Sequence, residues 1–103
     1  MKAIITGGCG FIGSHLASSL IKSGIRVTII DNLSNGRLEN LEDFKDSPLL
    51  DVCIADISDK GSFEHNFVEC DVIFHLAALA DIVPSIEHPE EYFNSNVIGT
   101  FNV

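Results

Sequence analysis

The stretch Thr6-Gly7-Gly8-Cys9-Gly10-Phe11-Ile12-Gly13 decides the fold of this 103-residue chain. It follows a short apolar run, Lys2 to Thr6, and opens a segment with an apolar side chain at every fourth position from Ile12 to Leu20. Gly24 ends that segment. A buried strand, a glycine-rich turn and an amphipathic helix over residues 11 to 23 are therefore expected in this order.

The glycines follow the spacing Gly-x-x-Gly-x-x-Gly between a strand and a helix, which is the context that makes such a motif informative. Gly7 permits a tight turn out of the strand, Gly10 lets a pyrophosphate approach the backbone, and Gly13 lets the helix pack closely on the strand. The free N–H groups of the first helical turn, with about half an elementary charge from the helix dipole, would then face the phosphates.

An acidic residue lies at the position where a dinucleotide-binding glycine loop is usually followed by one. The β-branched run from Arg26 to Ile30 predicts a second strand that ends at Asp31, 18 positions after Gly13. A carboxylate there can accept hydrogen bonds from the adenosine ribose and would repel a 2′-phosphate. The next residue is Asn32 rather than a cation, so the sequence predicts binding of NAD rather than NADP. The loop also lacks the lysine that a P-loop nucleotide site requires.

The remaining elements complete an alternating pattern. Strands are expected over Leu49 to Ala55 and Asp71 to Leu76, and helices over Ser58 to Val68 and from Pro89 to the chain end. The segment from Asn32 to Pro48 reads as a loop with one helical turn. Right-handed βαβ units with apolar strands predict an α/β, Rossmann-type doubly wound parallel sheet with strand order 3-2-1-4, the first half of a larger fold.

Composition excludes several classes of function. The net charge is −9, which opposes binding to nucleic acid or to an anionic membrane. No apolar run reaches the ~18 residues that span a bilayer. Three cysteines without pair spacing favour reduced thiols and a cytoplasmic protein, and four scattered histidines predict no metal site.

Two further strand ends are candidate contacts for a nucleotide. Asp56 with Ile57 follows the third strand and could accept a hydrogen bond from the adenine amino group, although an acid beginning a helix is an equal alternative. The small residues after His75 could let a ribose and pyrophosphate pass close to the backbone, or could serve tight packing alone. Cys9 is expected to be a packing residue rather than a nucleophile, since no base adjoins it in sequence.

Five motifs together resemble the extended short-chain dehydrogenase/reductase family, and its NAD-dependent sugar-nucleotide epimerases and dehydratases, including UDP-glucose 4-epimerases, most of all. The motifs are Thr6-Gly7-Gly8-x-Gly10-Phe11-Ile12-Gly13-Ser14-His15, Asp31-Asn32-Leu33-Ser34-x-Gly36, Asp56-Ile57, His75-Leu76-Ala77-Ala78 and Asn96-Val97-x-Gly99-Thr100.

The resemblance implies a set of residues that contact NAD. In it the glycine loop with Phe11 and Ile12 lines the pyrophosphate, Asp31 to Gly36 surrounds the ribose, and Asn96 lies near the cofactor from a following helix. Ser85 matches a position that can touch substrate, although a plain loop serine is as good an interpretation. The cofactor-binding residues implied are Gly7, Gly10, Phe11, Ile12, Gly13, Asp31, Asn32, Leu33, Ser34, Asn35, Gly36, Asp56, Ile57, Leu76, Ala77, Ala78, Ala80 and Asn96.

The resemblance also implies chemistry that this chain does not supply. The family uses a Ser or Thr with a Tyr-x-x-x-Lys, whereas the only tyrosine here, Tyr92, is followed four residues later by Asn96 and no lysine follows Lys60. No catalytic residue is therefore assigned. Residues 1 to 103 are expected to be the N-terminal NAD-binding segment of a longer enzyme, inactive alone.

The expected enzyme is a nucleotide-sugar epimerase that acts on a UDP-sugar by transient oxidation at the sugar C4 and is a homodimer at full length. Ala80 stands where epimerases acting on UDP-galactose often have lysine. This departure leaves open acetamido-sugar and uronic-acid epimerases, 4,6-dehydratases and decarboxylases. A non-catalytic NAD-binding sensor module is the alternative from a different class.

Overall fold

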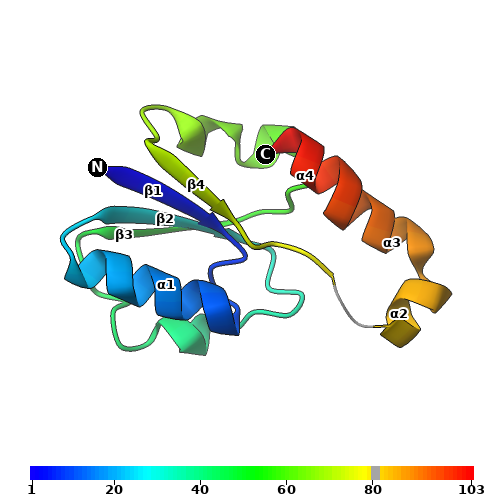
Figure 1. The fold of residues 1–103 in the computed structure, drawn as a ribbon, viewed down its shortest axis with the longest axis horizontal. Coiled ribbons are helices and arrows are strands. Elements are labelled where there is room, and N and C mark those ends of the chain that lie inside the picture. The colour runs from blue at the N-terminus through cyan, green and yellow to red at the C-terminus, as the bar shows by residue number, and fades with distance from the viewer. Residues whose placement is uncertain (80–81) are drawn as a thin grey trace.

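The computed structural model, which describes residues 1–79 and 82–103, contains one parallel sheet of four strands (Figure 1). The strands are β1 (Lys2–Thr6), β2 (Arg26–Asp31), β3 (Leu50–Ile54) and β4 (Val72–His75). Their order is β3-β2-β1-β4, as the sequence predicts. The chain changes direction of winding at β1, so a crevice opens between the carboxyl ends of β1 and β4, where ligands bind in such sheets.

Both faces of the sheet are covered, because successive side chains of a strand point to opposite sides. Ile5 and Ile29 face α1 (Phe11–Lys22) and are fully buried there. Ile4 and Ile30 face the other way and pack against Phe63, which is 1% exposed. This two-sided burial explains why the strands read as continuous apolar runs rather than as alternating ones.

The predicted helix over Ser58 to Val68 is wrong. The segment instead forms two short 3₁₀ turns, Lys60–Ser62 and Glu64–Phe67. Polar side chains there bond to the nearby backbone in place of a helical ladder: the Ser62 hydroxyl donates to the carbonyl of Asp59 at 2.7 Å. Such local bonds compete with helix formation. Phe63 and Phe67 nonetheless pack together, with ring centroids 5.7 Å apart.

The C-terminal part is helical but not uniform. A short helix that the sequence did not predict, α2 (Ile82–Glu87), precedes α3 (Pro89–Phe93), which begins at Pro89 as expected. A π-helical turn, Asn94–Ile98, then joins α3 to α4 (Gly99–Asn102). In Figure 1 these last three pieces form one rod along the far side of the crevice from α1. The loop after β2 carries the expected helical turn as a 3₁₀ turn, Leu38–Leu41.

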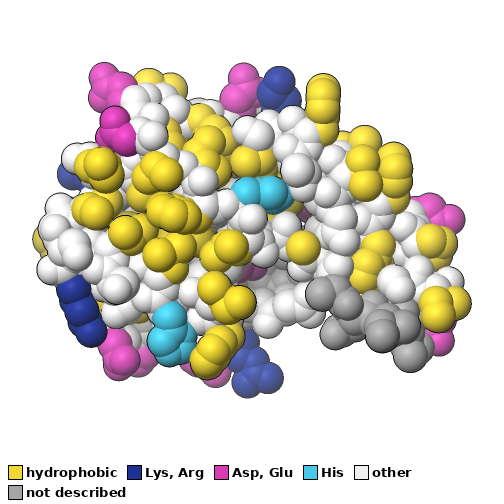
Figure 2. Space-filling model, in the orientation of Figure 1, with side chains coloured by type: hydrophobic (Ala, Val, Ile, Leu, Met, Phe, Trp, Pro, Cys, Tyr) yellow, Lys and Arg dark blue, Asp and Glu magenta, His cyan; other side chains and the backbone are white. Residues whose placement is uncertain are grey.

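The surface is apolar around the edge strand β4. Figure 2 shows hydrophobic side chains gathered on the face where Figure 1 draws β4 and α1. At this edge Ile73 is 39% and Leu76 41% exposed. Among the described residues, no helix is long and apolar enough to cross a membrane.

Candidate functional site

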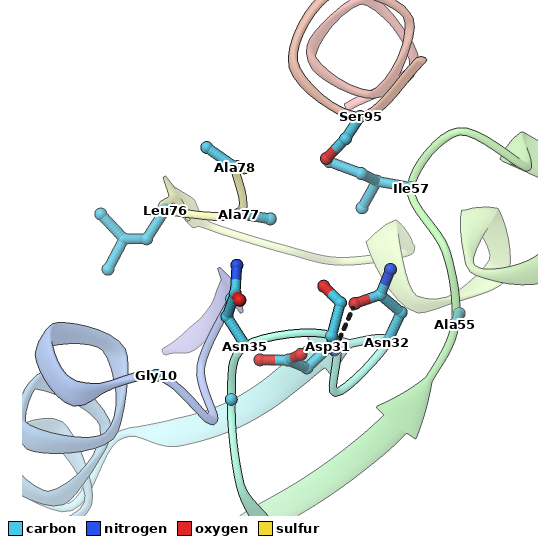
Figure 3. Close-up of a pocket in the computed structure, with 13 residues that line it drawn as sticks. Gly10, Asp31, Asn32, Asn35, Ala55, Ile57, Leu76, Ala77, Ala78 and Ser95 are labelled. Atoms are coloured by element: carbon cyan, nitrogen blue, oxygen red, sulfur yellow. Dashed lines mark hydrogen bonds between the residues drawn. The ribbon is translucent and has the colours of Figure 1, made fainter. Parts of the chain in front are cut away.

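A cavity of about 110 Å³ lies at the carboxyl edge of the sheet, and all four strands contribute to it (Figure 3). The segments that follow β1, β3 and β4, the end of β2 and the loop after it, and one residue of the π-helical turn form its wall. The lining residues are Gly7, Gly10, Asp31, Asn32, Ser34, Asn35, Gly36, Ala55, Ile57, Leu76, Ala77, Ala78 and Ser95. This is the crevice that the strand order predicts.

Glycine is required at two positions of the first loop, for a different structural reason at each. Gly7 has φ +73°, and a Cβ on it would lie 2.8 Å from the backbone nitrogen of Ala77. A Cβ on Gly13 would collide with the carbonyl oxygen of Gly7. These two glycines are required by the fold itself.

Gly10 has no such requirement. Its φ of −76° and ψ of 176° are extended backbone that any residue adopts. The nearest atom to a Cβ there is the carbonyl oxygen of Gly7, at 3.3 Å. Because Gly10 lines the cavity, a side chain at this position would fill space that a ligand needs, rather than disturb the protein.

The N-terminus of α1 leaves hydrogen-bond donors unused. The first backbone bond into the helix runs from the N–H of Ser14 to the carbonyl of Gly10, at 2.9 Å. Among the described residues, no side chain caps this end, and its first turn carries no acid. The N–H groups of Phe11, Ile12 and Gly13 are thus free to bind an anion. The side chains of Phe11 and Ile12 are 78% and 70% exposed, so these residues would contribute backbone rather than side chains.

Asp31 stands on the floor of the cavity with its carboxylate held in place (Figure 3). Its Oδ2 accepts the N–H of Cys9 at 3.0 Å, and its Oδ1 accepts the N–H of Leu33 at 2.7 Å. A carboxylate has about four lone-pair sites, so each oxygen keeps one for a ligand hydroxyl. Of the described residues that line the cavity, none is lysine or arginine. The site therefore suits a neutral diol and disfavours a phosphate at the same place.

Cys9 joins the glycine loop to the loop after β2. Its carbonyl accepts the N–H of Arg37 at 3.0 Å and the side-chain amide of Asn40 at 2.8 Å. A Cβ on Gly36 would lie 2.8 Å from the Cβ of Cys9, which shows how closely the two loops pack. Burial, and secondarily the charge of Asp31, raises the pKa of the Cys9 thiol to about 11. Burial outweighs the helix dipole, and Cys9 is a packing residue.

We expect Cys9 to resist alkylation. At pH 8 a thiol of pKa about 11 is ionised in about one molecule in a thousand, and only the thiolate reacts. Cys9 is also fully buried, whereas Cys53 and Cys70 are half-buried. Iodoacetamide treatment followed by peptide mass spectrometry should label Cys53 and Cys70 well before Cys9. In guanidinium all three should react alike; equal labelling in the folded chain would contradict the assignment.

A second hollow of about 340 Å³ adjoins the cavity and shares Asn32, Ser34 and Ser95 with it. Asp56 lies on its wall, as do Leu79 and residues of the C-terminal helical rod. The Asp56 Oδ1 accepts both the N–H and the hydroxyl of Ser58, at 2.9 and 2.7 Å. Asp56 thus begins a tight turn rather than a helix, and it also lies on the wall of this hollow. Its contact with adenine stays a prediction.

The structure brings together most of the residues that the sequence singles out. Those that line the cavity are Gly7, Gly10, Asp31, Asn32, Ser34, Asn35, Gly36, Ile57, Leu76, Ala77 and Ala78. Six others do not line it: Leu33, Asp56 and Asn96 are each next to a lining residue in the chain, and Phe11, Ile12 and Gly13 follow Gly10. Ser85 lies on α2 and is not among the lining residues, and Ala80 lies outside the described residues.

Two lining residues were missed. Ala55 follows β3, and its small apolar side chain gave no signal. Ser95 lies one position before Asn96 in the π-helical turn, and its side chain lies near Ile57 at the cavity in Figure 3. Asn96 instead bonds through both side-chain polar atoms to the backbone of Leu79, at 2.8 Å each. Within the described chain no group of three His, Cys, Asp or Glu side chains could hold a metal ion.

A parallel 3-2-1-4 sheet with a glycine loop, an uncapped helix N-terminus and an acid ending β2 defines a Rossmann-type dinucleotide-binding segment. The comparison with protein families agrees: the model described as GDP-mannose 4,6-dehydratase matches residues 4–103. The chain belongs to this family of sugar-nucleotide dehydratases and epimerases, and the resemblance to extended short-chain dehydrogenases/reductases is confirmed.

Individual relatives include different enzymes. The chain is 34% identical to the bifunctional UDP-glucose 4-epimerase and UDP-xylose 4-epimerase 1 of Pisum sativum, over 99% of the chain and 31% of that protein. It is 39% identical to the UDP-N-acetyl-alpha-D-glucosaminuronate decarboxylase of Bacillus cytotoxicus, with the same coverage.

The fold also matches that of solved structures. The UDP-glucose 4-epimerase of Thermus thermophilus, in complex with NAD, superimposes with a TM-score of 0.84 at 35% identity, covering 99% of this chain and 32% of that one. The chain thus spans about a third of the length of the relatives it matches.

Proposed function

We propose that residues 1–103 bind NAD as the cofactor-binding segment of a longer nucleotide-sugar epimerase. The observation that carries this proposal is the pairing of Gly10 with Asp31 across one cavity. Gly10 has no structural need to be glycine but leaves room for a pyrophosphate, and Asp31 keeps acceptor sites for ribose hydroxyls. The free N–H groups at the start of α1 supply the anion-binding part.

In this proposal the chain binds and orients the cofactor and supplies no group that reacts. NAD, when bound, provides the transient oxidation at the sugar C4. The proton-transfer residues and most of the contacts to the UDP-sugar belong to the remainder of such an enzyme, which in relatives is about two thirds of the length. We further propose that the protein is cytoplasmic, in keeping with its three cysteines, which form no disulfide among the described residues. We also propose that the full-length enzyme is a homodimer, as the family resemblance implies.

A nucleotide-sugar decarboxylase or 4,6-dehydratase is the second candidate. The 39% identity to a decarboxylase is higher than the 34% and 35% identity to the two epimerases named above, and the matching family model is that of a dehydratase. These enzymes begin from the same bound cofactor, so the cavity described here suits each of them. A non-catalytic NAD sensor would keep the cavity and lack the reacting groups.

Two measurements test the proposal. Isothermal titration of the chain with NAD should give binding, and a chain that shows neither heat nor thermal stabilisation would refute the cofactor. The enzyme that contains this chain should then convert UDP-glucose to its C4 epimer without net consumption of NAD. Release of CO₂ from a uronic-acid substrate or formation of a 4-keto-6-deoxy sugar would select the second candidate. Binding without any turnover would select the sensor.

A further inference from the structure

A series of hydrogen bonds between polar side chains connects the end of β1 to the C-terminal helical rod. The hydroxyl of Thr6, which is fully buried, lies 2.6 Å from Nδ1 of His75 at the end of β4. Nε2 of the same imidazole lies 2.8 Å from the hydroxyl of Thr100 on α4. The Thr100 hydroxyl in turn lies 2.6 Å from the carbonyl oxygen of Asn96. His75 thus links the two threonines.

The donors and acceptors favour one arrangement of protons, in which the N–H of Leu76 is shared between the carbonyl of Thr6, at 3.0 Å, and the Thr6 hydroxyl. The Thr6 oxygen accepts the N–H groups of Leu76 and Ala77, at 3.1 and 3.2 Å, so its own hydrogen goes to Nδ1 of His75. The imidazole then carries its hydrogen on Nε2 and donates it to Thr100, whose hydrogen goes to the Asn96 carbonyl. Burial lowers the pKa of His75, in agreement with the neutral ring that this arrangement needs.

The two ends of this series lie on opposite walls of the cavity. The Thr6 hydroxyl holds the backbone of Leu76 and Ala77, which line one wall. The π-helical turn that contains Asn96 presents Ser95 on the other wall, and Ser95 lines the second hollow as well. The Asn96 side chain adds the two bonds to Leu79, farther along the same segment.

We propose that His75 is a positioning residue for dinucleotide binding, which bridges Thr6 and Thr100 and thereby sets the separation between the Leu76–Ala78 wall and the wall that carries Ser95. The inference rests on the proposed NAD-binding function and deepens it. His75 itself is not among the lining residues, so its effect on the ligand is transmitted by the backbone segments that it joins.

Thr100→Val tests this role with little risk to folding, because Thr100 is exposed and valine keeps its shape. Loss of the His75 contact should weaken NAD binding by about fivefold to tenfold, the fold-change that corresponds to one hydrogen bond. Thr100→Ser restores the hydroxyl and should bind within about twofold of the unaltered chain. Ser23→Ala is the matched control: the Ser23 hydroxyl also bonds the carbonyl four residues earlier, but at the end of α1, far from the cavity in sequence.

Nitrogen NMR of the His75 imidazole reports which ring nitrogen carries the hydrogen, and a general loss of stability would not change this tautomer. The unaltered chain and Thr100→Ser should show His75 as the neutral tautomer with hydrogen on Nε2, and Thr100→Val should show it in a mixture of tautomers. Equal NAD affinity in Thr100→Val and the unaltered chain would overturn the positioning role alone. Loss of affinity in both Thr100 variants would also overturn it. Absence of NAD binding by the unaltered chain would overturn the proposed function and this role together.

Discussion

Asp31→Asn should lower the affinity for NAD by at least about tenfold and remove most of the preference for NAD over NADP. The carboxylate keeps one acceptor site on each oxygen for the ribose hydroxyls. Hydrogen bonds to a charged acceptor contribute about 1.5 to 3 kcal/mol each. The same charge repels a 2′-phosphate by about 4 kcal/mol at a separation of ~4 Å in an effective dielectric of about 20. The unaltered chain should therefore favour NAD over NADP by at least about a hundredfold.

The ratio of the two affinities is the right measurement for this variant. Asparagine has one acceptor oxygen, whereas Asp31 accepts N–H groups from Cys9 and Leu33 on different oxygens. The NH₂ group of the asparagine would then face the N–H of either Cys9 or Leu33, which is also a donor. We therefore expect the free energy of unfolding to fall by about 1 to 3 kcal/mol. This loss affects both cofactors alike and cancels in the ratio. Asp51→Asn, an exposed acid on β3, is the matched control and should leave the ratio unchanged. An unaltered ratio in Asp31→Asn would contradict the assigned role of the carboxylate.

Gly10→Val should reduce NAD affinity by at least about tenfold, while lowering the free energy of unfolding by only about 1 kcal/mol, because valine is a poorer residue than glycine at the start of a helix. The backbone at Gly10 is extended, and the single close contact of an added Cβ is 3.3 Å from the Gly7 oxygen. The valine side chain would instead enter the cavity where the pyrophosphate is expected. Isothermal titration and differential scanning calorimetry measure the two effects separately.

Gly24→Ala provides the opposite result as a control. Gly24 has φ +82° at the end of α1, with nothing within 4 Å of an added Cβ. The left-handed backbone alone should cost about 1 to 2 kcal/mol of stability and leave NAD affinity unchanged. If Gly10→Val lost stability and kept its NAD affinity, the cavity would not be the pyrophosphate site.

Local sequence patterns were sufficient to predict secondary structure where the contacts join residues close in the chain, and to predict where the strands end. The strand, glycine turn and helix from Lys2 to Lys22 follow from spacing alone, because each glycine serves a turn only a few residues long. The parallel order of the strands follows from alternation and from the handedness of βαβ units. The predicted helix over Ser58 to Val68 is wrong because the side chains of Asp56 and Ser62 bond to the nearby backbone, which hydrophobic spacing does not reveal.

The sequence by itself determined the sheet, the glycine loop and the acid at the end of β2, because these depend on periodicity and on residues adjacent in the chain. Only the tertiary structure decided that a side chain at Gly10 would meet a single close atom, that Ser95 lines the cavity and that His75 joins Thr6 to Thr100. Those contacts join residues up to 69 positions apart. They depend on the alignment of the carboxyl ends of the strands and on the position of the helical rod beside them, and neither arrangement leaves a periodic signal in the sequence.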